Sequence, residues 1–248
     1  HSLLRRMEQR ALGKKDEPIV IEEFPGLDGE VAWDPRPISR DGSERVIRFA
    51  FDYAKHRQAK TGAPQSVTCV DKSNVTRGCQ LFRKIFREFA ERNQDIAVKE
   101  AYIDAFTMWL VRNPEDLDVV VLPNMFGDIA TDLASVLQGG MGMSASANMG
   151  PKHMLFEPVH GSSPKHAGKN VVNPIAMIQS VQMMFEALAF RKKDQNLDTC
   201  AEILQSAIQK HFEDGGIVTY DLGGSASTSE VGQAIAMRCE SMLKERFP

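Results

Sequence analysis

The chain has 248 residues, of which 42% are hydrophobic, enough to bury the core of one large domain or two moderate ones. Its 30 basic and 33 acidic residues give a formal net charge of −3, which offers no electrostatic case for binding nucleic acid or a membrane surface. No apolar run reaches the roughly 20 residues of a membrane span, and the four scattered cysteines form no C-x-x-C pair, so we expect reduced thiols and a cytoplasmic protein.

The N-terminal part of the chain carries weak structural signals. Residues 2–12 are basic and compatible with a helix, and residues 18–21 with a short strand. Ser43 is a favourable N-cap for a helix to about Arg57, in which apolar residues recur at helical spacing. The first residue is His1 rather than methionine, which is typical of a trimmed sequence or of part of a longer product.

From residue 66 onward, short apolar strands alternate with amphipathic helices. Strands of this kind, followed by helices of about ten residues or more, predict an α/β architecture with parallel pairing. The predicted strands are residues 66–70, 96–102 and 118–122, and the predicted helices are residues 78–92 and 104–112.

The stretch NMFGDIATD, residues 124–132, follows the third of these strands, and Gly127 is predicted to open a helix. Asp128 and Asp132 are four residues apart, so their side chains share one face of that helix. Two carboxylates in this arrangement repel each other by roughly 0.2–0.5 kcal/mol, and no lysine or arginine of the same helix can compensate them. A divalent cation with oxygen ligands, Mg²⁺ or Mn²⁺, would do so. The alternative is a solvated acidic helix start.

Small residues replace the apolar pattern after Leu137. Three glycines and the small residues up to Asn148 predict a flexible crossing between two domains, residues 1–138 and 139–248. Beyond it we expect strands at residues 155–159 and 217–220 and helices at residues 174–190, 198–212 and 229–246.

The predicted loop before the helix at Pro174 reads EPVHGSSPKHAGKNVVNP, residues 157–174. A loop rich in glycine, serine and proline can present backbone N–H groups to a nucleotide at close range. Taken alone, it could equally be an ordinary connection.

Four segments in this order resemble the β-decarboxylating dehydrogenases, which include the isocitrate, 3-isopropylmalate, homoisocitrate and tartrate dehydrogenases. They are VDKSNV at residues 70–75, NMFGDIATD, the loop at residues 157–174 and LGGSASTSEVGQAI at residues 222–235. The resemblance covers roughly Trp33 to the end of the chain. It implies an α/β, isopropylmalate dehydrogenase-like two-domain fold without the N-terminal part of the cofactor domain. Residues 1–138 would then form the dimerisation and catalytic domain, and residues 139–248 the C-terminal half of the cofactor-binding domain.

The resemblance also implies a reaction and its ligands. The family oxidises a 2-hydroxy di- or tricarboxylate by hydride transfer to NAD or NADP and then releases CO₂. A metal ion bound by the hydroxyl and its neighbouring carboxylate stabilises the alkoxide and then the enolate. Asp128 and Asp132 match the metal ligands from one subunit, and Asp104 matches the third, from the partner. The metal would be Mg²⁺ or Mn²⁺.

Two further residues match the family's catalytic positions. Lys72 matches the lysine that takes the hydroxyl proton, and Asn74 matches the asparagine near the substrate and the nicotinamide. Because Lys72 and Asp104 would enter the partner's active site, the resemblance implies a homodimer with shared sites. Without the resemblance, Lys72 is interpreted as a surface lysine at a strand end.

The cofactor loop favours NADP over NAD. Where NAD-dependent relatives carry an aspartate after G-S-A-P, this chain has Lys165 and His166, which attract a 2′-phosphate. Asn173 matches an adenine-contacting asparagine. The remaining cofactor contacts that the resemblance implies are Glu157, His160, Gly161, Ser162 and Ser163. The alternative for Lys165 and His166 is a solvated loop pair.

One segment departs from the family pattern. The family's R-E-N-x-E-G-x-Y segment corresponds to residues 21–33, where Glu22 or Glu23 replaces the carboxylate-binding arginine and Val31 replaces the tyrosine. Glutamate would repel a carboxylate substrate. Two hypotheses follow: an NADP-dependent decarboxylating dehydrogenase, or a non-catalytic or regulatory subunit or remnant that keeps the fold. The loop at Lys165 favours isocitrate as substrate, whereas residues 221–230 and 124–135 are closer to the isopropylmalate branch.

Overall fold

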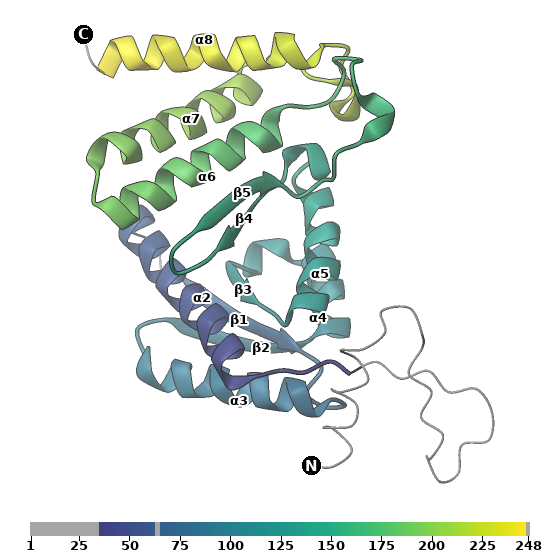
Figure 1. Ribbon diagram of the computed structural model, residues 1–248, viewed down its shortest axis with the longest axis vertical. Coiled ribbons are helices and arrows are strands. Elements are labelled where there is room, and N and C mark those ends of the chain that lie inside the picture. Colours follow the sequence, from purple (N-terminus) through teal and green to yellow (C-terminus); the bar gives the residue numbers. More distant parts are fainter. Residues whose placement is uncertain (1–34, 63–64, 247–248) are drawn as a thin grey trace, which may run out of the picture. The chain divides into compact units, whose positions relative to one another are not determined.

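The computed structural model describes residues 35–62 and 65–246 (Figure 1). The predictions for residues 2–12, 18–21 and 21–33, including Glu22, Glu23 and Val31, lie outside the described residues. The chain divides into two compact units. The first comprises His1–Tyr102 and Asp118–Pro123, and the second comprises Ile103–Leu117 and Asn124–Pro248.

The described part of the first unit is built on a parallel sheet of three strands in the order β2-β1-β3. The strands are β1 (Ser66–Asp71), β2 (Ala97–Tyr102) and β3 (Val119–Val121). β1 pairs with both neighbours, with Ser66 opposite Ala97 and Val67 opposite Val119. Every residue of β1 after Ser66 is buried, as expected for the central strand of a parallel sheet. The predicted α/β class is therefore confirmed.

Two helices, α2 (Arg40–Thr61) and α3 (Arg77–Arg92), complete the first unit. The predicted N-cap at Ser43 is wrong, because the helix begins one turn earlier. Ser39 is the N-cap, and its Oγ accepts a hydrogen bond from the Gly42 N–H at 3.2 Å. Ser43 lies inside the helix, where its hydroxyl donates to the Ser39 carbonyl at 2.8 Å. The helix ends at Gly62, whose φ of 71° is the left-handed conformation that favours glycine.

The core of the first unit is rich in phenylalanine. Phe51 of α2 and Phe86 of α3 are each 1% exposed, and their ring centroids lie 5.6 Å apart. The stripe of apolar residues predicted along α3 is the face that packs against α2 and β1. The buried members of this core are Ile47, Ala50, Phe51, Ala54, Val67, Cys69, Phe82, Ile85, Phe86, Phe89, Ile96, Val119 and Val121.

The second unit contains five described helices and a hairpin (Figure 1). The helices are α4 (Ile103–Arg112), α5 (Asn124–Leu137), α6 (Ile175–Lys192), α7 (Gln195–Glu213) and α8 (Thr228–Arg246). α7 packs against both α6 and α8, and their shared core contains Ile175, Ile208, Val231 and Ile235. α5 begins at Asn124 rather than at the predicted Gly127, so Asp128 lies in its second turn.

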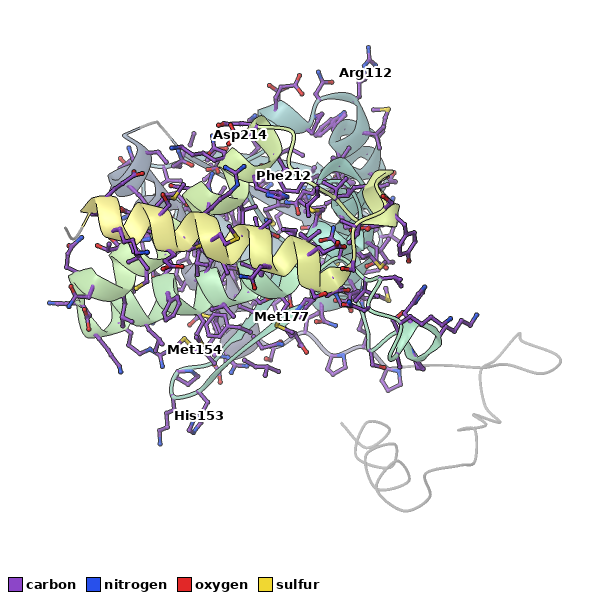
Figure 2. The ribbon with its side chains drawn as sticks, turned by 90° about the horizontal axis from the view of Figure 1, so that it is seen from above. Arg112, His153, Met154, Met177, Phe212 and Asp214 are labelled. Carbon is purple, nitrogen blue, oxygen red and sulfur yellow. The ribbon has the colours of Figure 1, made fainter. Side chains whose placement is uncertain are left out.

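A hairpin takes up the last four residues, 145–148, of the segment predicted as a flexible crossing. β4 (Ala145–Met149) pairs antiparallel with β5 (Met154–Pro158), with Ala145 opposite Pro158. Its turn is closed by a hydrogen bond from the Gly150 N–H to the His153 carbonyl at 3.0 Å, and His153 and Met154 lie at the outer end of the hairpin in Figure 2. The small residues of β4 do not predict a strand by themselves. The strand forms because β5 supplies its backbone hydrogen-bond partners.

The predicted strand at residues 217–220 is not formed. The carbonyl groups of Val218 and Thr219 instead accept hydrogen bonds from the N–H groups of Ala226 and Gly224, both at 3.0 Å. Tyr220–Leu222 is a short 3₁₀ helix. The β-branched residues 217–219 therefore belong to a tight loop and not to a strand. Among the described helices, none combines the length and apolar character needed to cross a lipid bilayer.

Candidate active site and cofactor loop

The end of β1 carries two of the predicted catalytic residues. Lys72 is half-buried and Asn74 is exposed, in a turn that leads from β1 into α3. The Lys72 carbonyl accepts hydrogen bonds from the N–H groups of Val75 and Thr76, both at 3.0 Å. Gln80 of α3 donates its Nε2–H to the Ser73 carbonyl at 3.0 Å. The turn is therefore held by its own backbone and by the following helix.

Asp71, which sequence reasoning did not single out, anchors this turn. Its side chain is fully buried and accepts two hydrogen bonds from Arg83, Nε to Oδ2 at 2.8 Å and Nη2 to Oδ1 at 2.9 Å. The Ser73 N–H donates to Asp71 Oδ1 at 2.7 Å. Burial, with a further contribution from the Asp71 charge, raises the pKa of the Cys69 thiol, which stays protonated and lies 3.9 Å from Asp71 Oδ2.

The predicted metal ligands lie on two helices of the second unit. Asp104 is in the first turn of α4, while Asp128 and Asp132 lie one turn apart on α5, and all three are exposed. Asn124 donates its Nδ2–H to Asp128 Oδ2 at 3.1 Å. In residues 35–62 and 65–246, no three acidic, histidine or cysteine side chains form a metal-binding group. The prediction takes its third ligand from a partner subunit, so one chain does not test it.

The predicted phosphate-binding residues lie in the loop between β5 and α6. His166 bridges two hydroxyl groups: its Nδ1 lies 2.7 Å from Ser163 Oγ, and its Nε2 lies 3.3 Å from the Tyr220 hydroxyl. The rings of His166 and Tyr220 are stacked with centroids 6.1 Å apart. In a neutral imidazole one ring nitrogen donates and the other accepts. Lys165 is exposed beside this group. Tyr220 was missed as a site residue because 54 positions separate it from His166.

The N-terminus of α8 holds the far end of the same loop. Asn170, at a φ of 55°, donates its Nδ2–H to Ser229 Oγ at 2.8 Å and accepts from the Ser229 N–H at 3.1 Å. The Thr228 N–H donates to the Asn170 carbonyl at 2.9 Å, and the Thr228 hydroxyl donates to the Val172 carbonyl at 2.6 Å. The serine- and threonine-rich segment near the end of the chain therefore fixes the loop.

Asn173 is buried, and both ends of its side-chain amide are used within the chain. Its Oδ1 accepts from the Ile175 N–H at 3.0 Å, and its Nδ2–H donates to Asp221 Oδ2 at 3.1 Å. The second Nδ2 hydrogen points to Met143 Sδ at 3.5 Å, so a further side-chain contact, such as one with adenine, would fall on the second lone pair of Oδ1. Gly142 packs against this pair, since a Cβ there would lie 2.8 Å from Asp221 Oδ2. The adenine contact stays a prediction.

The other predicted cofactor residues are accessible to different degrees. Glu157 of β5 is exposed and accepts a hydrogen bond from Asn148 Nδ2–H of β4 at 3.1 Å. His160 is half-buried, and its Nδ1–H donates to the Gly161 carbonyl at 2.8 Å. Gly161 and Ser162 are exposed. Glu157 therefore lies in β5, and His160, Gly161 and Ser162 lie in the connection that follows it.

Comparison with known proteins agrees with this architecture. Residues 14–235 match the isocitrate/isopropylmalate dehydrogenase family profile. The homoisocitrate dehydrogenase of Methanocaldococcus jannaschii is 40% identical over 219 residues, covering 88% of this chain and 59% of that protein. The 3-isopropylmalate dehydrogenase of Methanothermobacter thermautotrophicus is 41% identical over 206 residues, covering 83% of this chain and 59% of that protein.

A solved structure gives the same result for the fold. The crystal structure of a β-decarboxylating dehydrogenase from Thermococcus kodakarensis, in its apo form, is 39% identical and matches with a TM-score of 0.75 over 88% of this chain and 61% of that one. The chain therefore spans about three fifths of the length of these proteins. On the strength of the profile match and these relatives, the chain belongs to the isocitrate/isopropylmalate dehydrogenase family.

Proposed function

We propose that this chain forms the catalytic and C-terminal cofactor-binding part of an NADP-dependent decarboxylating dehydrogenase. Its substrate is a 2-hydroxy di- or tricarboxylate, and its metal is Mg²⁺ or Mn²⁺. The observation that carries the proposal is the pair Asp128 and Asp132, exposed on one face of α5. No lysine or arginine in the described part of the chain forms a salt bridge with either. Two adjacent carboxylates of this kind fit a hard divalent cation.

The proposed reaction assigns a distinct task to each group. Asp128 and Asp132, with Asp104 of a second copy of the chain, would hold a divalent cation, which would supply Lewis acidity to the substrate. Lys72 Nζ takes the proton of the C2 hydroxyl as hydride leaves C2 for the nicotinamide. Asn74, exposed two residues further along the same turn, orients the substrate and the nicotinamide. Loss of the β-carboxylate as CO₂ leaves an enolate, which takes a proton from water to give the 2-keto acid product.

Exposed apolar side chains on α4 and α5 support the proposed homodimer. Such side chains, gathered on two helices that pack together, are typical of a protein interface. The group includes Met108, Trp109, Met125, Ile129 and Val136. Asp128 and Asp132 lie on the same helix as the last three of these, so a partner docked there would approach the proposed metal ligands.

The donors in the cofactor loop support NADP as the oxidant. Lys165, the His166 imidazole and the Tyr220 hydroxyl provide a positive charge and two polar groups near one point of the loop. A 2′-phosphate offers a negative charge to Lys165, and acceptor oxygens to the imidazole or the hydroxyl once their mutual hydrogen bond opens, whereas the ribose hydroxyl of NAD offers no charge to Lys165.

An activity assay tests the proposal. The protein is incubated with Mn²⁺, NADP and, separately, isocitrate, isopropylmalate, homoisocitrate, malate and tartrate, and reduced cofactor is followed by absorbance. We expect turnover with at least one of these acids, and its loss when EDTA removes the metal. A preparation that is dimeric by light scattering and inactive with every acid would instead favour the non-catalytic subunit.

A charge reversal in the cofactor loop tests the choice of cofactor. In Lys165→Asp we expect the KM for NADP to rise about 10- to 100-fold, as for the loss of one charge-assisted hydrogen bond. The KM for NAD should stay the same or fall, because an aspartate at this place can bind the ribose hydroxyl. Lys169→Asp makes the same change of charge in the same exposed loop and serves as the control. If both variants weaken NADP equally, Lys165 acts only through general electrostatics, and an unsubstituted protein that prefers NAD contradicts the assignment.

A further inference from the structure

A buried ion pair lies directly before Lys72 in the chain. The Asp71 side chain is 0% exposed, and the Arg83 side chain that pairs with it is 12% exposed. The Arg83 Nη2–H also donates to the Ala101 carbonyl at 2.8 Å, and its guanidinium lies 4.9 Å from the centre of the Tyr102 ring. One arginine of α3 therefore joins the ends of β1 and β2.

Stability alone is a poor explanation for this pair. Removing two charges from water costs about as much as their attraction returns, so a pair of well-packed apolar residues would stabilise the fold equally well. The neighbouring pair, Arg87 with Glu100 at 2.6 Å, is an ion pair at the surface, because 62% of the Arg87 side chain is exposed. Such a pair avoids most of the cost of removing charges from water. What distinguishes Asp71 is its place in the chain.

The hydrogen bonds of Asp71 fix both neighbours of Lys72. Asp71 is clamped by Arg83, and the same carboxylate binds the N–H of Ser73 on the other side of Lys72. The Ser73 carbonyl is held in turn by Gln80. With residues 71 and 73 both anchored, the direction in which Lys72 leaves the backbone is set before any ligand arrives.

Arg83 also neutralises the carboxylate nearest to Lys72 in the chain. Without the guanidinium, the Asp71 carboxylate would be a buried charge with no opposite charge beside it, which is strongly destabilising. With the guanidinium in place, the carboxylate keeps the position in which its Oδ1 accepts from the Ser73 N–H.

We propose that Arg83 is a positioning residue for Lys72, acting through Asp71. The inference rests on the proposed function, in which Lys72 Nζ takes the hydroxyl proton. Arg83 does not contact the substrate in this scheme. It sets the geometry of the group that does.

The test compares two arginines of α3. In Arg83→Met we expect kcat, per folded protein and well below the melting temperature, to fall about 10- to 100-fold, because a small misplacement of a catalytic group has effects of this size. The KM for NADP changes less than about twofold, as for a group that acts on the reaction step alone. Arg87→Met, one turn along the same helix, leaves kcat within about twofold. Arg83→Lys, which keeps the charge but not the paired hydrogen bonds, gives an intermediate value.

Amide hydrogen exchange provides a readout that does not require turnover. In Arg83→Met the amides of Ser73, Val75 and Thr76 lose protection, while those of β1 keep it. Protection lost evenly throughout the first unit would mean a general structural role and overturn the inference. Local loss with unchanged kcat would overturn it as well and leave the proposed function intact. If the unsubstituted protein shows no turnover, the proposed function fails. The rate of acetylation of Lys72, quantified by mass spectrometry, then tests the positioning role separately. An acetylation rate that is the same in Arg83→Met as in the unsubstituted protein rejects positioning, and a changed rate supports it.

Discussion

We expect the replacement of Lys72 with methionine to lower kcat by about 10² to 10⁴, the usual contribution of a positioned general base or acid. Methionine keeps much of the length and apolar stem of lysine but has no nitrogen to take the hydroxyl proton. Lys72 is half-buried in a turn whose backbone hydrogen bonds use its carbonyl and not its amine. We therefore expect the free energy of unfolding to change by no more than about 0.5 kcal/mol. Steady-state kinetics with Mn²⁺ and NADP, with urea unfolding of the same sample, measure both quantities.

Lys84→Met is the matched control for this variant. Lys84 is an exposed lysine of α3, in the same unit, and no proposed role falls on it. Its substitution removes the same charge and should leave kcat within about twofold. Equal losses in the two variants would assign the effect to net charge, and an unchanged kcat in Lys72→Met would remove Lys72 from the proposed proton transfer.

The parts of the fold that the sequence predicts are those governed by local patterns. The parallel sheet follows from apolar strands alternating with helices, and the apolar stripe of α3 follows from helical spacing. Local signals compete at the helix ends, however. Ser39 and Ser43 are both acceptable caps, and only the observed bond from the Gly42 N–H to Ser39 separates them.

Elements whose formation depends on a partner strand were missed or misassigned. β4 consists of small residues and exists because β5 pairs with it, whereas residues 217–220 have strand-like composition and form no strand in the described chain. β-propensity describes how a side chain fits a neighbouring strand. It therefore cannot show whether that neighbour is present.

The same distinction applies to the candidate site. Motifs identify Lys72, Asp128 and Lys165, because the residue type and its immediate neighbours define each of them. The groups that support such residues come from elsewhere in the sequence. Arg83 lies 12 positions from Asp71, and Tyr220 lies 54 positions from His166. Their contacts depend on how β1 meets α3 and how the loop before α6 meets the loop before α8, which no short motif records.

The aromatic core of the first unit leads to the largest expected change in stability. Phe86 is 1% exposed and lies between α2 and the sheet, with its ring 5.6 Å from that of Phe51. Phe86→Ala removes most of a buried side chain and leaves a cavity that the packed helices fill only in part. We therefore expect a loss of about 3–5 kcal/mol in the free energy of unfolding. Urea denaturation followed by circular dichroism measures this loss.

Phe49→Ala separates the cavity effect from the loss of an aromatic ring as such. Phe49 belongs to α2 of the same unit and is 45% exposed, with its ring stacked on Tyr53 at 6.0 Å. Its removal leaves no buried cavity. We therefore expect the free energy of unfolding to fall by only about 0.5–1 kcal/mol, the range of an aromatic pair at the surface. Because unfolding exposes nearly the same area in both variants, the denaturant slope should stay constant and only the midpoint should move. Similar losses for Phe49 and Phe86 would mean that the contact between α2 and α3 is looser than the buried rings indicate.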